Sequence, residues 1–294
     1  MITERPSPGD ADFEHERPRL VGLAYRITGS RSTAEDVVQD AWLRWEHADQ
    51  AAIDRPAAWL TTTTSRLALD HLKSARHQRE SYVGPWLPEV ATTEPGPADQ
   101  VELAESVTIG FLALLERLGP VERVVFLLAD VFAVPFEEIA ASVDRSPEAC
   151  RQIASRARVR VREGRPRFTP TDDGAWQVAT AFLTAAQVGD TTSLISLLAS
   201  DAVAVSDGGA AHRAARRPIV AERIPRYVIN LTARLPTDGE TTLQLINGQP
   251  GIVIWVEGKP VMAVGVAVAN GQVQHLWSIL NPDKLRSLGS APIC

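Results

Sequence analysis

The sequence predicts a multidomain protein in which two all-α domains are followed by an α+β domain. Its 294 residues are too many for one ordinary domain. Apolar residues recur at helical spacing from about Arg17 to Arg167, interrupted by a proline-rich stretch from Ser81 to Asp99. Beyond Pro170, strand-like apolar runs alternate with short turns, which is typical of an α+β domain.

The composition is that of a globular protein whose basic residues are unevenly distributed. Apolar residues make up 45% of the chain, and the formal net charge is −6. Two stretches reverse this sign: Arg66–Arg79 has four basic residues against Asp70, and Arg151–Arg167 has seven arginines against Glu163. Because salt screens charges beyond roughly 10 Å, such local basic surfaces can bind a polyanion despite the negative total.

The two cysteines, Cys150 and Cys294, indicate neither a disulfide framework nor a metal site. Residues Met1 to Asp12 lack the apolar core of a signal peptide, and no run of about 18 apolar residues occurs. We therefore expect a cytoplasmic protein without a membrane segment, a metal or a cofactor.

The first segment predicts two principal helices. Ser32 or Thr33 is expected to cap a helix that ends near His47. Its apolar side chains fall within one arc of roughly 140°, the expected core face: Val37, Val38, Ala41, Trp42 and Trp45. The polar residues Asp36, Gln39 and Asp40 point away from that face.

A second helix, from about Pro56, combines an aromatic residue with spaced cations. These residues are Trp59, Arg66, Lys73, Arg76 and Arg79. Single-stranded DNA is bound by such a mixture, because aromatic rings stack on unpaired bases and cations follow the phosphates. The alternatives are a core position for the tryptophan and a solvated face for the cations.

A helix-turn-helix is predicted further along. A helix over Val121–Asp130 is followed by a short helix, Phe136–Ser142, a turn, and a longer helix from Pro147 that Ser146 can cap. On a helical projection, one side carries apolar residues: Cys150, Ile153, Ala154, Ala157 and Val161. An arginine stripe of about 60° lies beside them: Arg151, Arg158, Arg162 and Arg165.

The longer helix has the chemistry of a major-groove reader. Residues near the N-terminal end of such a helix contact base edges, and residues further along contact phosphates. Arg151 and Gln152 suit guanine and adenine edges, and Ser155 and Arg156 suit bases or backbone. The alternative is a solvated arginine face on an ordinary helix.

The C-terminal part predicts helices over about Trp176–Val188, Thr192–Leu198 and Ile219–Leu231. Strands are predicted at Ala202–Val205, Thr241–Ile246, Gly251–Val256, Val261–Val268 and Val273–Ile279. Asn247-Gly248, Glu257-Gly258 and Asn270-Gly271 read as hairpin turns. In the proline-rich stretch, Tyr82, Val83, Trp86 and Leu87 are more apolar than a free linker requires, so we expect them to dock on another surface.

The two helical segments resemble regions 2 and 4 of extracytoplasmic-function (ECF) sigma factors. The resemblance to region 2 rests on Leu23-Ala24-Tyr25-Arg26, Ala34–Trp42, Pro56–Leu60 and Arg66–Asp70, and that to region 4 on Leu114–Arg160. The chain is similar in particular to the SigJ-type subgroup with a C-terminal SnoaL-like domain. Motifs of that subgroup are Trp86-Leu87-Pro88-Glu89, Asp207-Gly208-Gly209 and Asn281-Pro282-Asp283-Lys284-Leu285.

The resemblance implies a non-enzymatic subunit that directs RNA polymerase to promoter DNA. It implies a region 2 helical bundle (1–80), a linker (81–106), a region 4 helix-turn-helix (107–168) and a cone-shaped α+β barrel (169–294). Asp36, Gln39 and Asp40 would contact the β′ clamp helices of core polymerase, and region 4 its β flap.

The resemblance also assigns DNA contacts. The −10 element would be bound by Trp59, Arg66, Lys73, Arg76 and Arg79. The −35 element would be read by Ser146, Arg151, Gln152, Ser155, Arg156 and Arg158. We expect the C-terminal domain to dock on the linker and on regions 2 and 4 through the three subgroup motifs: Trp86, Leu87, Pro88, Asp207, Gly208, Gly209, Asn281, Pro282, Asp283 and Lys284.

Two alternatives use the same residues differently. The first is a helix-turn-helix regulator with a ligand-binding C-terminal domain, which leaves the segment from Arg17 to Arg79 unexplained. The second is a fused SnoaL-type cyclase or isomerase, in which Asp207, His212 and His275 would be the acid–base groups. Such chemistry requires that these side chains converge in one pocket.

Overall fold

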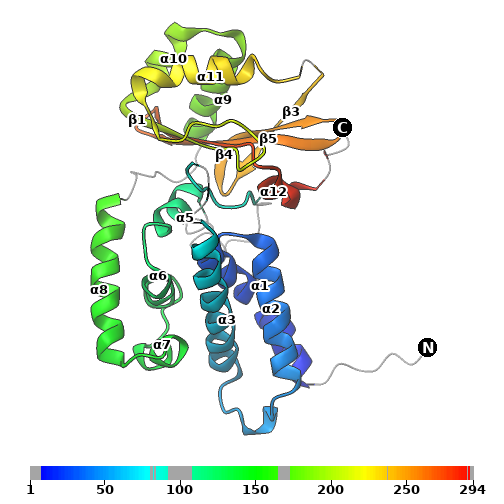
Figure 1. The fold of residues 1–294 in the computed structure, drawn as a ribbon, viewed down its shortest axis with the longest axis vertical. Helices are drawn as coiled ribbons and strands as arrows, with labels where there is room; N and C mark the ends of the chain where they lie inside the picture. The colour runs from blue at the N-terminus through cyan, green and yellow to red at the C-terminus, as the bar shows by residue number, and fades with distance from the viewer. Residues whose placement is uncertain are drawn as a thin grey trace, which may run out of the picture. The chain divides into compact units, whose positions relative to one another are not determined.

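The structure is a computed structural model that describes residues 8–79, 82, 84–91, 108–164, 173–236, 238–289 and 291; side chains are described for these except 8–12, 75–79, 164 and 173. Two compact units are present (Figure 1). The first, of residues 1–80 and 115–164, is helical, and the second, of residues 81–114 and 165–294, is an α+β unit. The predicted fold class is therefore confirmed.

The first unit begins with a bundle of three helices. They are α1 (Pro8–Thr28), α2 (Arg31–Glu46) and α3 (Pro56–Arg79), with a 3₁₀ turn η1 (Gln50–Ala52) before α3. Four of the five predicted core residues on α2 are buried, and Trp42 is partly exposed. Asp36, Gln39 and Asp40 are exposed, as the projection predicts.

The predicted N-cap of α2 is wrong by two or three residues. Ser30, not Ser32 or Thr33, is the cap: its backbone is extended and its hydroxyl accepts a hydrogen bond from the Thr33 N–H at 3.2 Å. The reason is Gly29, which adopts φ 72° and turns the chain sharply after α1. The new helix can therefore start at Arg31.

The rest of the first unit is the helix-turn-helix, formed by α6 (Pro120–Phe126), α7 (Phe136–Val143) and α8 (Pro147–Gly164). The predicted helix over Val121–Asp130 is only partly correct. Its second half is a π-helical turn, η3 (Leu127–Val131), closed by a bond from the Phe132 N–H to the Leu127 carbonyl at 3.0 Å.

Two buried arginines connect the bundle to the helix-turn-helix. Arg123 on α6 donates to the carbonyl of Ile27 on α1 at 3.0 Å, and it forms an ion pair with Glu116 at 2.7 Å. Arg26 on α1 lies 5.6 Å from the ring centre of Phe132. Burial lowers the pKa of Arg26 to about 10, so it stays charged at neutral pH. These contacts join helices that are far apart in sequence.

The second unit contains one six-stranded sheet in the order β2-β1-β6-β5-β4-β3. The strands are β1 (Leu198–Asp207), β2 (Ile219–Val220), β3 (Glu240–Ile246), β4 (Gln249–Val256), β5 (Lys259–Ala269) and β6 (Gln272–Ile279). Among the strand pairs of the described residues, only β1–β6 is parallel. The three predicted hairpin turns are confirmed, because both residues of each turn have positive φ, as a type I′ turn requires.

Helices lie on both faces of this sheet (Figure 1). On one face are α9 (Asp173–Val188), α10 (Thr191–Leu197) and α11 (Ile224–Thr232). On the other are α5 (Ile109–Leu115), α12 (Pro282–Leu285) and the short turn η5 (Arg286–Leu288). The predicted helix over Ile219–Leu231 is wrong at its start. Ile219 and Val220 instead pair with β1, and a 3₁₀ turn, η4 (Ala221–Arg223), precedes α11.

Side chains alternate between the two faces along each strand. Ile252 and Ile254 of β4 pack towards α9, whereas Val253 and Trp255 pack on the opposite face. Because both faces are buried, β4 is apolar almost throughout, which explains why its sequence shows no alternation. Among the described helices, none has the length and hydropathy needed to cross a membrane.

Replacing Ser30 with alanine tests the observed cap. Loss of the bond to the Thr33 N–H is expected to cost about 1 kcal/mol and to accelerate amide exchange in the first turn of α2 roughly fivefold. Hydrogen exchange followed by mass spectrometry measures this rate. Thr33→Ser is the control: it keeps the backbone N–H that bonds Ser30 and should change the rate by less than about twofold. Equal acceleration by the two variants would contradict the assignment.

Candidate nucleic-acid interface and linker contacts

The turn between α7 and α8 is built from local backbone signals. Asp144 ends α7 in the left-handed conformation, at φ 54°. The Ser146 hydroxyl then accepts a hydrogen bond from the Ala149 N–H at 3.2 Å, as the predicted N-cap should. All five predicted apolar residues of α8, from Cys150 to Val161, are buried. The sequence therefore determines which face of α8 is left open.

The open face of α8 has an exposed centre and ion-paired edges. Gln152, Ser155 and Arg156 are exposed. Arg151 forms an ion pair with Glu137 at 2.9 Å and lies 5.4 Å from the ring centre of Phe136.

Two further arginines are held on the flanks of α8. Arg158 pairs with Asp130 at 2.8 Å, and Arg160 pairs with Glu122 at 2.5 Å. Arg162 is exposed, and Arg165 lies outside the described residues. The arginine stripe that the projection predicts is therefore partly engaged within the protein.

Trp59, Arg66 and Lys73 share one side of α3, because they are seven residues apart. Trp59 is partly buried and packs against Trp45, with ring centres 5.5 Å apart. Trp59 therefore occupies a core position in part, which was the alternative to a role in binding bases.

The cations of α3 are not all open to solvent. The Arg66 guanidinium donates twice to the carbonyl of Ala141 on α7, at 2.7 and 3.1 Å. Lys73 is exposed, 3.5 Å from Asp70. The side chains of Arg76 and Arg79 lie outside the described part of the chain. Arg66 thus binds the helix-turn-helix through α7.

The exposed polar face of α2 contains one apolar residue that sequence reasoning missed. Leu43 is 42% exposed and follows Gln39 and Asp40 by one helical turn, so it lies among the three polar residues. A helical projection of the face that contains Asp36, Gln39 and Asp40 could have located Leu43.

The linker lies against the C-terminal sheet, and Asp207 is its main anchor. Asp207, at the end of β1, is 1% exposed. One carboxylate oxygen accepts from the Leu87 N–H at 2.8 Å and from the Lys284 ammonium at 2.5 Å. The other accepts from the Tyr82 hydroxyl at 2.5 Å and the Gly209 N–H at 3.0 Å. Four donors thus satisfy this buried charge.

Lys284 on α12 completes the anchor from the other side. Its ammonium also donates to the Leu87 carbonyl, and it lies 4.0 Å from the ring centre of Trp86 and 5.0 Å from that of Tyr82. The Asn281 side chain donates to the Tyr82 hydroxyl at 2.8 Å. Burial raises the pKa of Tyr82 far above its usual value, and the bond to Asp207 adds to this, so the phenol stays protonated.

The two glycines after Asp207 are required sterically. Gly209 has φ 58°, and a Cβ there would lie 2.7 Å from the Asn281 side chain. A Cβ on Gly208 would lie 2.3 Å from the His212 carbonyl oxygen. Pro282 and Asp283, by contrast, form the exposed first turn of α12, which Asn281 caps. They shape the motif without a described bond to the linker.

Further along, the linker pairs with the C-terminal domain through its backbone. Val90 donates to the Lys284 carbonyl at 3.1 Å. The Ala91 carbonyl accepts a hydrogen bond from the Asn247 N–H, and the Ala91 N–H donates one to the Asn247 side-chain oxygen. Leu87 and Val90 are buried in a cluster with Trp255, Trp277 and Leu285, and Pro88 is buried beside them. The predicted docking of the linker apolar residues is therefore seen for Tyr82, Trp86 and Leu87, whereas Val83 lies outside the described residues.

The three acid–base candidates do not converge. Asp207 is bound to Lys284 and the linker. His212 is exposed. His275 stacks on Trp277 and pairs in register with Val203, four residues before Asp207 on β1. Burial lowers the pKa of His275. The arrangement that a SnoaL-type cyclase would need is absent among these residues.

A helix-turn-helix packed on a helical bundle with a cationic helix defines a DNA-binding transcription factor. The Sigma-70 region 2 family model matches residues 13–78, and the Sigma-70, region 4 model matches residues 110–161. An ECF RNA polymerase sigma factor of Mycobacterium tuberculosis (strain ATCC 25618 / H37Rv), SigJ, is 40% identical over 288 residues, covering 93% of this chain and 92% of that protein.

A probable ECF sigma factor of Mycobacterium tuberculosis (strain CDC 1551 / Oshkosh), SigI, is 32% identical over 96% of both chains. The crystal structure of Mycobacterium tuberculosis SigJ superimposes with a TM-score of 0.75 at 36% identity, covering 94% of this chain and 98% of that one. The chain therefore belongs to the ECF family of RNA polymerase sigma factors. It is SigJ-like, with an additional C-terminal α+β domain of the SnoaL-like type.

Lys284→Met tests the anchor. It leaves the Asp207 carboxylate buried without its counter-charge, so the second unit is expected to lose about 3–5 kcal/mol of unfolding free energy. Urea unfolding of the full-length protein, followed by tryptophan fluorescence, measures the loss.

Asp283→Asn is the matched control for Lys284→Met. It breaks an ion pair with Arg286 whose side chains are 73% and 78% exposed, and it should change the unfolding free energy by less than about 1 kcal/mol. If both variants cost the same, the ion pair between Asp207 and Lys284 does not hold the linker.

Proposed function

We propose that this sigma factor selects promoters by reading the −35 element with α8 and the −10 element with α3. The observation that carries the proposal is the exposed centre of α8, behind a capped turn, in a chain that also contains region 2. Gln152 would read a base edge, and Arg156 and Ser155 would bind phosphates or bases. Ser146, Arg151 and Arg158 would complete this surface, the two arginines by exchanging carboxylate partners for DNA phosphates.

For the −10 element we propose Trp59, Arg66, Lys73, Arg76 and Arg79. Captured bases would stack on the partly exposed Trp59 ring, and the cations would follow the single strand. Arg66 must leave the Ala141 carbonyl to do so. We therefore propose that the compact first unit is a closed state, and that α3 and α7 separate when the two elements are bound.

The partner proposed for α2 is core RNA polymerase. Asp36, Gln39 and Asp40 form an exposed acidic and polar face suited to the β′ clamp helices, with Leu43 as an apolar contact at its centre. Region 4 would contact the β flap. Because the polymerase is intracellular, we propose a cytoplasmic location.

For the C-terminal domain we propose a regulatory role without catalysis. It holds the linker between the two sigma regions and also packs against Ile109 on α5. Helix α5 starts one residue before the match to region 4. We propose domains at 1–80, 81–106, 107–168 and 169–294, with contacts of the last domain to regions 2 and 4. A domain that holds the linker can limit how far the two DNA-reading helices separate.

Run-off transcription with core polymerase on a promoter library tests the DNA-reading role. Gln152→Ala should relax the preference at one −35 position and reduce transcription about tenfold. Arg156→Ala should weaken all promoters similarly and reduce the salt dependence. Arg160→Gln is the control, because Arg160 pairs with Glu122 on the flank of α8. If no promoter supports initiation by the wild type, the proposed function is wrong.

A second library, with spacers of different length between the −35 and −10 elements, tests the regulatory role. The full-length protein should favour one spacer length, and a chain ending near Thr169 should discriminate less. Lys284→Met should show the same loss within the intact chain, whereas Asp283→Asn should not. Identical spacer preferences in all four proteins would exclude regulation through the linker.

A further inference from the structure

We propose that the C-terminal domain binds the phosphate backbone of duplex DNA through a stripe of exposed arginines beside β2. The residues of this arginine stripe are Arg213, Arg216, Arg217, Arg223 and Arg226. Within Gly208–Arg226 the one acidic residue is Glu222, in a chain whose formal net charge is −6. The C-terminal domain therefore contains a third stretch of reversed charge, which neither sigma region accounts for.

The arginine stripe follows one edge of the sheet. Strand β2 is the outermost strand on that side and pairs with β1. Three of the arginines come from the segment that joins β1 to β2, and two from η4 and the start of α11, so the stripe flanks β2 at both ends. The linker supports this segment: a Cβ on Gly84 would lie 3.6 Å from the Arg216 Cα, whereas Arg216 as a whole is exposed.

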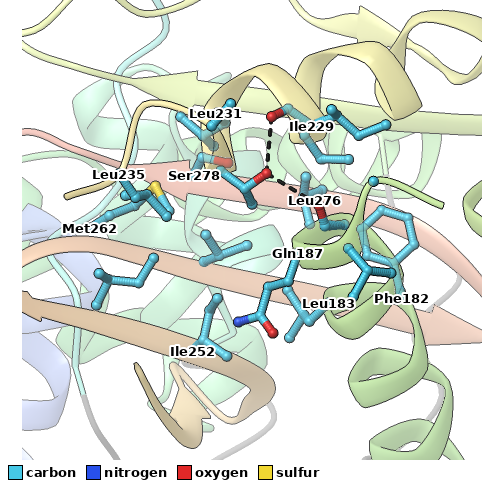
Figure 2. A pocket seen from close by; sticks show the side chains of 18 of the residues that line it. Phe182, Leu183, Gln187, Ile229, Leu231, Leu235, Ile252, Met262, Leu276 and Ser278 are labelled. Atoms are coloured by element: carbon cyan, nitrogen blue, oxygen red, sulfur yellow. Dashed lines mark hydrogen bonds between the residues drawn. The ribbon is translucent and has the colours of Figure 1, made fainter. Parts of the chain in front are cut away.

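Helix α11 has an apolar side and a cationic start. Ile229 and Leu231 face an apolar cavity between α9, α11 and the sheet (Figure 2). The sheet lines the same cavity with three side chains labelled in Figure 2: Ile252, Leu276 and Ser278. Arg223 and Arg226 are instead exposed at the start of the helix. Because cations are unfavourable at that end of a helix, the stability of α11 does not explain these two arginines.

The arginine stripe is available to a partner. Within the part of the chain that the structure describes, none of its five arginines has an ion pair or a side-chain hydrogen bond. On α8, by contrast, Arg151, Arg158 and Arg160 pair with carboxylates. The stripe can therefore bind an anion without first giving up an internal partner.

The side chains of the stripe favour the backbone of duplex DNA. All five cations are arginines, whose planar guanidinium groups bind phosphate through two parallel hydrogen bonds. The segment Gly208–Arg226 has no Phe, Tyr or Trp on which unpaired bases could stack, and no Asn or Gln to read adenine edges. We therefore expect contacts to phosphates that do not depend on the base sequence.

Such contacts add affinity for DNA and leave sequence selection to the sigma regions. The C-terminal domain follows region 4 in the same chain, so DNA bound by region 4 raises the effective concentration of phosphates at the stripe. An effect on promoter occupancy would rest on the proposed reading of the −35 element. Binding of DNA without polymerase does not rest on it.

Binding can be measured on the full-length protein by fluorescence anisotropy. The probe is a fluorescein-labelled DNA duplex of arbitrary sequence, in NaCl from about 50 to about 200 mM. Each phosphate contact contributes about 0.9 to the slope of log K against log salt concentration. A second duplex of unrelated sequence should give the same slope, because backbone contacts carry no sequence information.

Two double variants test the stripe on either side of β2. Arg216→Gln with Arg217→Gln, and Arg223→Gln with Arg226→Gln, should each lower the slope by about one to two and weaken binding in about 50 mM NaCl at least about fivefold. The matched control is Lys259→Gln with Arg286→Gln, which removes the same charge from exposed positions of the same domain. It should change the affinity less than about twofold.

Thermal unfolding of each variant confirms that it is folded. A wild-type slope in either stripe variant, or an equal loss of affinity in the control, would overturn the proposal. If the stripe variants weaken binding to core polymerase and leave DNA binding unchanged, the stripe contacts an acidic protein surface and the proposal is wrong. None of these results would alter the conclusion about promoter selection, which the transcription assays measure separately.

Discussion

The second unit depends on one buried ion pair, between Asp207 and Lys284. The two side chains are 0% and 8% exposed, and two oppositely charged groups are stable there only because every remaining bond is satisfied. Apart from the Gly209 N–H, the satisfying donors and acceptors come from the linker: the Leu87 backbone and the Tyr82 hydroxyl. Removing the linker would therefore leave the charged pair partly unsatisfied. The ion pair makes the linker a structural part of the C-terminal domain.

The same sheet serves two purposes because its side chains alternate. One face packs against the linker through Trp255, Trp277 and Ile279. The other lines the apolar cavity through Ile252, Val264 and Leu276. A SnoaL-like fold is thus used here to hold a neighbouring segment, and its potential acid–base residues lie away from the cavity. Fold alone would not have revealed this use.

In the first unit, surface contacts join the bundle to the helix-turn-helix. Arg66 is bound to the Ala141 carbonyl, and Arg55 forms an ion pair with Glu138 at 2.6 Å. Both contacts are exposed, so they are individually weak. The buried bonds of Arg123 to Ile27 and Glu116 are harder to replace. Opening of this unit would therefore depend more on Arg123 than on the surface pairs.

The sequence by itself determined the local features: the capped turn at Ser146, the buried face of α8, the start of α3 at Pro56 and the three hairpin turns. These depend on helical periodicity, capping and positive φ, which neighbouring residues control. Resemblance to the family singled out the motifs that contain Asp207 and Lys284, but not the partners of these residues. Only the tertiary structure decided that Asp207 binds Tyr82 and Leu87, that Arg66 binds Ala141, and that Ser278 faces a cavity. These pairs are many residues apart, and their contact depends on how the chain packs rather than on any local pattern.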